Sequence, residues 1–492
     1  MVMQNNYIND NSLHIPSDSR SSSLKWYKIT LSEVLKQGKR LDASVYNSDA
    51  RQAQLLLTKG KFSTINLGGP GGLIQRAFYP SRFKRVYCSK GSGKDFFLPS
   101  QMMDICPKPE KFISKSSNCD FDQLKLQRGT LLLSRSGTIG PVAYVSRTLE
   151  NKIFSDDVIR ISFENSYDAG YVYTYLKTQT GNLLLTTNGY GSVITHIEPE
   201  HLDSIPIPNA TTEIKKRIND LIEGSYALRD ESNKLISEAT SLLKEELHFT
   251  NFEDIQSNLY QQNASVETFN VKLSNLKNRV DASFHVPIVD SIVEHLGKYA
   301  QEITTIGDPQ ISEDVILPGR FKRIYVEREY GVKFLGGKEI YQLDPTSEKY
   351  LSLTKHKDRI SDQLVLRENM ILITCSGTVG KVCLTPKHWT GWTANQHIIR
   401  VTPACDQIAG YLYIYLSSEY AKPLITRFIY GSVVDEIDNN NIRQIPVPLL
   451  SNKSSQDTIN KLALLANDKR YSAYLLEQKA IEIFEKEVLS IS

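Results

Sequence analysis

The sequence predicts an α+β fold that occurs twice in one chain, with a mixed α/β globular domain followed by a long helix in each half. Three observations predict it: a long internal repeat, short apolar strands beside tyrosine-rich helical stretches in each half, and a proline-free heptad pattern after each globular part. The chain has 492 residues, of which 40% are hydrophobic and 23% are charged. This composition is typical of a folded protein with two to four domains and excludes wholesale disorder.

The internal repeat has an offset of 240 residues. Residues 134–208 align without a gap with residues 374–448, and 23 of the 75 positions are identical. The identical positions cluster in paired motifs: Ser-Gly-Thr-x-Gly at 136–140 and 376–380, Gly-Tyr-x-Tyr-x-Tyr-Leu at 170–176 and 410–416, Tyr-Gly-Ser-Val at 190–193 and 430–433, and Ile-Pro-x-Pro at 205–208 and 445–448. Upstream the offset becomes one or two residues shorter, so that Arg-Phe-Lys-Arg at 82–85 aligns with the identical segment at 320–323. A period this long indicates a duplicated domain and not a solenoid.

The repeat and its flanks define the expected segments. In chain order they are a flexible polar tail at 1–23, a first globular domain at 24–209, a first long helix at 210–247, a polar linker at 248–280, a second globular domain at 281–449 and a second long helix at 450–492. Alternating apolar residues predict strands at 130–133 and 142–145, and tyrosine spacing predicts helices over 171–185 and 411–424. Each Ile-Pro-x-Pro is expected to close its globular domain in extended form, because proline disfavours a helix at the residue before it.

The two long helices carry apolar or small residues at alternating steps of four and three. This heptad spacing predicts that the helices pair with each other, although each helix packing on its own domain would need a similar apolar stripe. Small residues in the seam favour close pairing of the helices. The candidate helix-pairing residues are Leu221, Leu228, Leu235, Leu242, Leu462, Ala466, Leu476 and Ile483.

Positive charge is concentrated inside the two globular domains. The formal net charge of the chain is only +3, but residues 76–128 carry a net +6 and residues 319–367 a net +4, so the remainder sums to −7. Aromatic residues and glycines lie between these basic residues, a pattern that suits a nucleic-acid backbone and base edges. A solvated basic face without a partner would also explain one such stretch, but two at equivalent places favour binding.

The Ser-Gly-Thr-x-Gly motif has two interpretations. Its glycines permit positive φ and its hydroxyls can cap a turn, so a tight hairpin explains it without a ligand. Its backbone amides are also suited to a phosphate group. It is not a Walker loop, because the Gly-Lys-Ser/Thr ending is missing.

The sequence holds no recognisable catalytic or metal motif. Cys375, Cys383, His388 and His397 form one conceivable metal set, but the first repeat has Arg135, Ala143, Thr148 and Asp157 at those positions, so the fold does not need a metal. The pair Asp156-Asp157 is likewise replaced by Gln396-His397 in the second repeat. Six irregularly spaced cysteines, no long apolar run and no secretory signal predict a cytoplasmic protein with reduced thiols and no membrane span.

The doubled order of these motifs resembles the DNA-sequence specificity subunit of type I restriction–modification systems. The resemblance is carried by residues 131–140 with 371–380, and by Gly191-Ser192-x-Ile194 with Gly431-Ser432-x-Val434, each followed 14 residues later by Ile-Pro-x-Pro; it covers residues 24–492. It implies two target recognition domains and two spacer helices paired as an antiparallel coiled coil with pseudo-two-fold symmetry. It also implies a non-catalytic chain that docks two methyltransferase subunits and, through them, restriction/translocase subunits.

Such a chain would read a bipartite, asymmetric site on double-stranded DNA. Each recognition domain would contact one half-site, as each subunit of a dimeric repressor does. The candidate DNA-contacting residues are basic and hydroxyl side chains of the basic stretches and the paired turns: Arg82, Lys84, Arg85, Lys90, Lys94, Arg135, Ser136, Thr138, Ser192, Arg320, Lys322, Arg323, Lys333, Ser376, Thr378 and Ser432. The resemblance implies no cofactor on this chain, with S-adenosylmethionine, ATP and Mg on the partner subunits only.

Three other interpretations remain open from the sequence. The chain resembles equally the specificity subunit of a two-component restriction enzyme, whose partner fuses nuclease and methyltransferase. A self-contained DNA-modifying enzyme would show turnover by the purified chain. A coiled-coil scaffold that pairs two protein-binding domains would lack salt-dependent DNA affinity.

Overall fold

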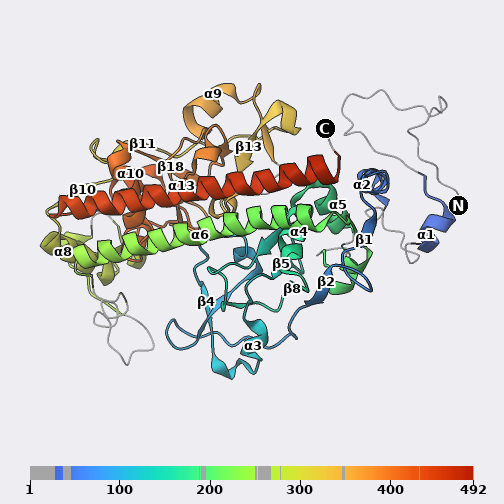
Figure 1. The fold of residues 1–492 in the computed structure, drawn as a ribbon. Helices are drawn as coiled ribbons and strands as arrows, with labels where there is room; N and C mark the ends of the chain where they lie inside the picture. The colour runs from blue at the N-terminus through green and yellow to red at the C-terminus, as the bar shows by residue number, and fades with distance from the viewer. Residues whose placement is uncertain are drawn as a thin grey trace. The chain divides into compact units, whose positions relative to one another are not determined.

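The computed structural model describes residues 28–36, 46–187, 189, 195–249, 252, 268–276, 279–345, 349–431 and 433–490 (Figure 1). Two compact units divide the chain: residues 1–102, 108–223 and 477–492 form the first, and residues 103–107 and 224–476 form the second. Both units contain sheets and helices, which confirms the predicted mixed α/β class. The expected tail at 1–23 lies outside the described residues.

The first unit contains most of the first copy of the repeat. Its strands are β1 (Thr64–Asn66), β2 (Ile74–Phe78), β3 (Lys94–Phe97), β4 (Lys111–Ile113), β5 (Leu131–Ser134), β6 (Val142–Tyr144), β7 (Ile153–Phe154), β8 (Val158–Phe163) and β9 (Pro206–Pro208). Its helices are α1 (Leu31–Lys36), α2 (Ser48–Thr58), α3 (Phe121–Leu124), α4 (Ser166–Lys177), α5 (Gln179–Thr187) and the beginning of α6 (Thr212–Glu246). The main sheet is antiparallel in the order β2-β8-β5-β6; β4-β3-β7 and β1-β9 form smaller sheets.

The second unit contains the second copy. Its strands are β10 (Glu302–Thr305), β11 (Ser312–Ile316), β12 (Tyr325–Val326), β13 (Gly331–Leu335), β14 (Tyr350–Ser352), β15 (Ile371–Thr374), β16 (Val382–Leu384), β17 (Thr393–Ala394), β18 (Ile398–Pro403) and β19 (Pro446–Leu449). Its helices are α8 (Pro287–Tyr299), α9 (Lys357–Arg359), α10 (Asp406–Leu416), α11 (Ala421–Thr426), α12 (Asn439–Arg443) and most of α13 (Lys453–Ile483). The sheets are β11-β18-β15-β16, β12-β14-β13-β17 and β10-β19.

The two copies share one topology. In the main sheet of each copy an edge strand pairs with a six-residue strand through a register shift. β2 pairs with β8, with the shift between Ile74 and Arg76, and β11 pairs with β18, with the shift between Ser312 and Asp314. The sheets that contain β3 and β13 each include one parallel pair, β3 with β7 and β13 with β17. The sequence repeat is therefore also a structural repeat, and its strands at 131–134 and 142–144 confirm the prediction.

The repeated tyrosines and prolines hold each copy together. Tyr171 and Tyr175, one turn apart on α4, are buried and donate their hydroxyls to the carbonyls of Pro208 and Pro206, both at 2.6 Å. A buried hydroxyl needs such a partner, and a proline strand at a sheet edge has a carbonyl to offer without an amide. The second copy repeats both bonds, from Tyr411 to Pro448 (2.5 Å) and from Tyr415 to Pro446 (2.7 Å).

Each long helix is fixed to its own tyrosine-rich helix by a buried asparagine. Asn219 on α6 accepts a hydrogen bond from the Gly170 amide at 3.0 Å, and Asn460 on α13 accepts one from Gly410 at 2.8 Å. A Cβ on Gly170 would lie 2.6 Å from the Asn219 Cα, so this contact requires glycine. The alternative that the sequence left open, packing of each long helix on its own domain, therefore occurs.

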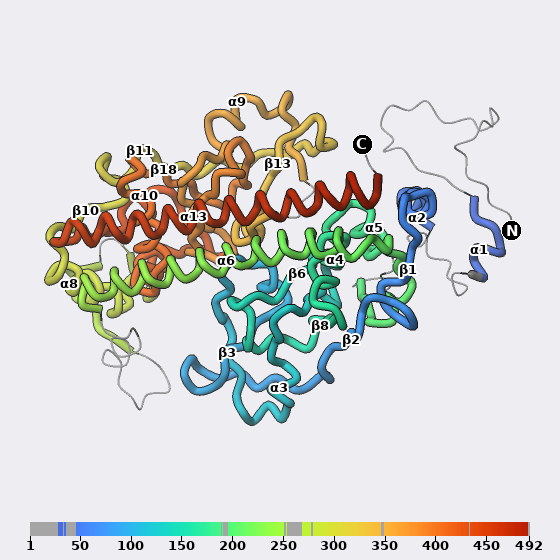
Figure 2. Tube along the Cα trace, viewed as in Figure 1, coloured from blue at the N-terminus to red at the C-terminus, as the bar shows by residue number. Residues whose placement is uncertain are grey.

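The two long helices also contact each other in antiparallel register (Figure 2). Within the second unit, Ser225 on α6 donates to the Ala473 carbonyl of α13 at 2.8 Å, and Glu231 pairs with Lys469 at 3.0 Å. Within the first unit, Arg217 pairs with Glu487, just beyond α13, at 2.9 Å. Residue numbers rise on one helix as they fall on the other, so the helices run in opposite directions where they meet.

The most buried seam of α6 lies beside the leucines singled out from the sequence. The leucines at 221, 228, 235 and 242 are half-buried, as are Leu462, Leu476 and Ile483 on α13, whereas Ala466 is fully buried. The buried residues of α6 are Lys215, Ile218, Asn219, Ile222, Ser225, Tyr226, Ser232, Ala239 and Leu243. Small residues therefore occupy the middle of the buried stripe at 225, 232 and 239, and larger apolar residues occupy its two ends.

Candidate nucleic-acid interface

The Arg-Phe-Lys-Arg segment has the same alternating geometry in both copies. Arg82 and Lys84 are exposed, whereas Phe83 packs edge-on against Phe96 at 6.5 Å and Arg85 lies over the same ring at 5.7 Å. In the second copy Arg320 and Lys322 are exposed, Phe321 packs on Phe334 at 6.5 Å, and Arg323 lies 5.9 Å from that ring. Each segment thus presents two cations to solvent and holds a third over an aromatic ring.

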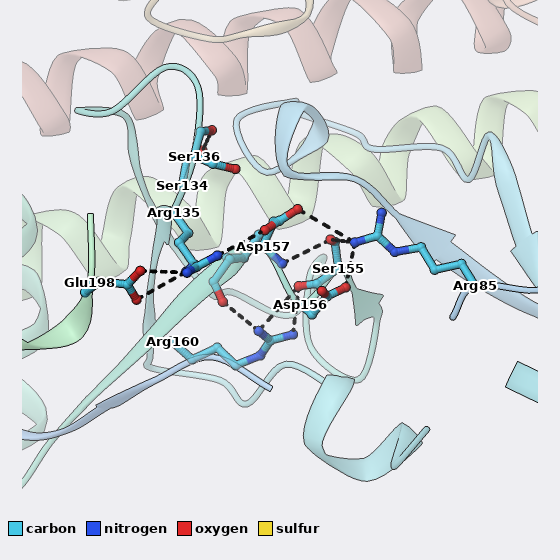
Figure 3. Close-up of polar contacts among 10 residues, drawn as sticks. Arg85, Ser134, Arg135, Ser136, Ser155, Asp156, Asp157, Arg160 and Glu198 are labelled. Atoms are coloured by element: carbon cyan, nitrogen blue, oxygen red, sulfur yellow. Dashed lines mark hydrogen bonds and ion pairs between the residues drawn. The ribbon is translucent and has the colours of Figure 1, made fainter. Parts of the chain in front are cut away.

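A network of carboxylates surrounds the third cation of the first copy (Figure 3). Arg85 Nη2 lies 2.6 Å from Asp156 Oδ1, 3.1 Å from Ser155 Oγ and 3.7 Å from Asp157 Oδ2. Burial alone would lower the pKa of Arg85, but the hydrogen bond and charge of Asp156 outweigh it and raise that pKa. Arg85 is therefore a paired cation in the free chain.

Arg135, at the start of the Ser-Gly-Thr hairpin, belongs to the same network. Its Nη2 lies 2.6 Å from Glu198 Oε1, its Nη1 lies 3.7 Å from Asp157 Oδ1, and its guanidinium lies 4.3 Å from the ring of Tyr79. The pKa of Arg135 is raised, first by the hydrogen bond to Glu198. Asp157 thus lies between the two arginines, as Figure 3 shows.

The second copy has neutral groups at three positions of this network. Cys375, Gln396 and His397 stand where the first copy has Arg135, Asp156 and Asp157. Gln396 Nε2 lies 3.3 Å from His397 Nε2, and burial, followed by the charge of Arg323, lowers the pKa of that histidine. At this site of the second copy, exposed Arg320 pairs with Glu436 at 3.2 Å.

A buried arginine fixes the loop that carries these differing residues. Arg160 on β8 donates to the carbonyls of Val158 (2.7 Å), Phe154 (3.1 Å) and Leu124 (3.2 Å). Arg400 on β18 repeats this arrangement with Ile398 (2.8 Å), Leu364 (3.4 Å) and Ala394. Burial lowers the pKa of Arg160 to about 10 and that of Arg400 to about 9, so both remain cationic at neutral pH.

The Ser-Gly-Thr motif forms the hairpin between the third and fourth strands of each main sheet. Gly137 and Gly377 have φ of 85° and 74°, a conformation that glycine adopts readily. Their amides donate to the carbonyls of Thr195 (3.0 Å) and Asp435 (2.9 Å), so those two amides are already used. The geometry accounts for the motif as a hairpin, with Thr138 and Thr378 exposed and Ser136 and Ser376 half-buried.

The remaining candidates differ in accessibility. Lys90 is exposed, whereas Lys94 lies over the ring of Phe121 at 4.9 Å. Lys333 lies over Trp392 at 4.2 Å and 3.5 Å from Asp344 Oδ1. Ser192 and Ser432 lie outside the described residues.

Sequence reasoning missed the groups that restrain the arginines. Asp156, Asp157 and Glu198 are far from Arg85 or Arg135 along the chain, and only the folded sheet brings them together. Arg160 and Arg400 carried a usable signal, because both follow isoleucine in the aligned repeat within an otherwise apolar strand.

The conceivable metal set is not assembled. Across the described part of the chain, no group of three or more His, Cys, Asp or Glu side chains is arranged to hold a metal ion. His388 instead bonds to the Leu343 carbonyl at 2.8 Å and stacks on Tyr474 at 4.0 Å. Within that same part of the chain, no helix is long and apolar enough to cross a membrane.

Comparison with known proteins gives one family match and several distant structures. Residues 330–462 match the family described as type I restriction modification DNA specificity domain. The S subunit of a type I restriction–modification system from M. genitalium is similar at 13% identity over 87% of this chain and 96% of that chain, with a TM-score of 0.33. The HsdS subunit from Thermoanaerobacter tengcongensis is similar at 13% identity, covering 86% and 99%, with a TM-score of 0.26. No curated protein matches the chain.

Proposed function

We propose that this chain is a DNA-binding specificity subunit that reads a bipartite and asymmetric DNA target, with one half-site per recognition domain. The match of residues 330–462 to the type I restriction modification DNA specificity domain supports this role, in which the chain is not an enzyme in its own right. The family match carries this proposal, and the structural repeat extends it to the first copy, which the match does not cover.

The direction of the two long helices supports a two-fold arrangement of recognition. A direct repeat in sequence becomes a pseudo-symmetric pair when its connecting helices run antiparallel, as the contact of Ser225 with Ala473 indicates. Two readers related in this way engage opposite strands of the duplex, and the helices then fix the distance between half-sites.

A second contact supports the same symmetry. Within the second unit Asp104 forms a β-bridge with Gln342, and the Ile105 amide donates to the Tyr341 carbonyl at 2.9 Å. Asp104 and Gln342 differ by 238 residues, the same offset that relates Arg82 to Arg320. Within the second unit, this contact therefore joins equivalent positions of the repeat.

The different groups on the two reading surfaces support an asymmetric target. The first copy presents arginines paired with carboxylates, and the second presents amide and imidazole groups at the same positions. Side chains of different hydrogen-bonding character select different base edges, so the two half-sites should differ.

The proposed partners are two methyltransferase subunits and, through them, restriction/translocase subunits. Affinity purification of the tagged full chain from its host, with mass spectrometry, should recover a separate adenine methyltransferase. A fused nuclease–methyltransferase would select the two-component alternative, and S-adenosylmethionine, ATP and Mg would act on those partners.

DNA binding by the purified chain tests the proposal independently of partners. Affinity for duplex DNA should fall steeply as salt rises, because cations such as Arg82 and Lys84 displace counterions from phosphates. Charge reversal at these two residues should weaken binding. Absence of DNA binding at low salt would contradict the proposal and favour a protein-binding scaffold.

A further inference from the structure

We infer that the loop between β7 and β8 (Ser155–Asp157) and its counterpart between β17 and β18 (Asn395–His397) read the bases, one loop per half-site. Asp157 and His397 are accessible members of these loops; Arg135 and Gln396 are covered groups beside them. The inference rests on the proposed function and names the residues that carry its specificity.

The two loops have the same backbone support. Arg160 and Arg400 each tie down the carbonyls on both sides of their loop, and the Asp157 and His397 carbonyls accept from the Arg135 and Cys375 amides at 3.1 and 3.0 Å. All three side chains nevertheless differ between the loops. A fixed backbone that carries different polar groups is the arrangement a sequence reader needs, because base contacts require precise placement.

In the first loop only Asp157 is polar and reaches solvent, whereas in the second loop both Asn395 and His397 are half-buried. Asp156 and Gln396 are 4% and 9% exposed, whereas the Asp157 side chain is 30% exposed and His397 is half-buried. The loop also adjoins the exposed cations of its own Arg-Phe-Lys-Arg segment through Arg85 or Arg323. These cations are suited to phosphates and would bring the loop to a groove.

Each site holds a buried polar atom that lacks a hydrogen bond. Arg135 is 9% exposed, and its Nη1 makes no hydrogen bond, although it lies 3.7 Å from Asp157 Oδ1 as an ion pair; Gln396 is 9% exposed and its Oε1 accepts no hydrogen bond. Buried polar atoms are rarely left without a partner, so each of these two indicates a contact that a ligand completes. Both atoms are covered in the free chain, so a neighbouring side chain must shift on binding, as interface side chains commonly do.

The chemistry of the two sites predicts two different base pairs. Arg135 and Asp157 place a donor and an acceptor 3.7 Å apart, which matches the guanine acceptors and the cytosine amino group in the major groove. Gln396 offers an acceptor beside its own amide donor, which matches the adenine amino group and N7. The first copy should therefore require a G·C pair and the second an A·T pair.

Selection of bound duplexes from a randomised library by the full chain tests this assignment. Asp157→Asn should relax the choice of one G·C pair about tenfold and leave the other half-site unchanged. Gln396→Leu should do the same to one A·T pair in the opposite half-site. Asp157→Glu keeps the carboxylate and should retain the G·C choice. Asp122→Asn is the matched control, because it removes a carboxylate from an exposed ion pair with Lys125 in the same copy.

The outcomes are distinguishable from failure of the proposed function. If the unaltered chain selects no bipartite sequence, the proposed function is wrong. If it selects one and Asp157→Asn leaves both half-sites unchanged, or lowers affinity for every duplex equally, the assignment of the loops is overturned. Circular dichroism melting identifies a variant that has lost its fold, and Asp157→Glu then decides the question.

Discussion

The two copies of the repeat are alike in the residues that hold the backbone and unlike in the residues that the backbone presents. Arg160 and Arg400 make the same carbonyl contacts, and the tyrosine–proline bonds recur. Beside this common frame, Arg85 is paired with a buried carboxylate, whereas the counterpart of that carboxylate is Gln396. Duplication therefore preserved the scaffold while the polar groups on it diverged, and the two surfaces have different electrostatics.

The largest expected effect comes from the buried arginines that both copies share. Replacing Arg160 with Met leaves several buried carbonyls without donors, and we expect a loss of about 3 kcal/mol or more in the free energy of unfolding. Arg400→Met should cost a similar amount. Hydrogen exchange resolved by peptide should show loosening around the altered loop alone; equal loosening of both copies would contradict their independence.

Acid stability should distinguish the copies next. Burial lowers the pKa of His388 to about 4, and the first copy has Thr148 at that position. Because the neutral form is favoured in the folded state, stability should fall as pH drops below about 6.5 and level off near 4, by about 3 kcal/mol in all.

Urea unfolding followed by fluorescence of Trp389 and Trp392 measures this loss in the second unit. His388→Phe keeps an aromatic ring beside Tyr474 and should remove the pH dependence, although it also removes the bond to Leu343. An unchanged pH profile in that variant would show that other groups cause the acid sensitivity.

Removing the equivalent arginines at 85 and 323 should affect different properties, stability in the first copy and DNA binding in the second. Arg85→Ala leaves the buried Asp156 carboxylate without its ion-pair partner and should lower the free energy of unfolding by about 2 kcal/mol. Arg323 lies over the Phe334 ring and forms no ion pair with a carboxylate of the described residues, so Arg323→Ala should affect stability little but weaken DNA binding and reduce the salt slope by about one. Denaturant titration and salt-dependent binding of both variants test the contrast, which fails if the two variants behave alike.

The smallest effect is expected where the copies are most alike. Tyr171→Phe and Tyr411→Phe each remove one hydroxyl bond to a proline carbonyl and should each cost about 1 kcal/mol. Thermal melts of the two variants should shift by similar amounts. A large difference between them would show that the shared frame is not equally important in both copies.

The sequence predicted the parts of the fold that depend on local pattern. The duplicated class, the strands at 131–134 and 142–144 and the tyrosine-rich helices follow from periodicity and repeat. Which residues of α6 are most buried could not be predicted in this way. That helix packs on α4 as well as α13, so Ile222 is buried in place of the predicted Leu221.

The ion pairs of the candidate interface could also not be predicted from the sequence. Arg85 and Asp156 are 71 residues apart, and Arg135 and Glu198 are 63 apart. Pairing over such distances depends on which strands are neighbours in a sheet, which residue spacing does not encode. The basic segment was visible in the sequence, but its division into exposed and paired cations was not.

The central claim is that this chain reads two half-sites held at one fixed separation. Its most direct test is the affinity of the full chain for duplexes that contain both selected half-sites with base pairs added or removed between them. We expect one preferred spacing and a steep loss of affinity when one or two base pairs are inserted, because the proposed role of the long helices is to set the distance between half-sites. Affinity that is indifferent to spacing, or unchanged when either half-site is scrambled, would contradict it.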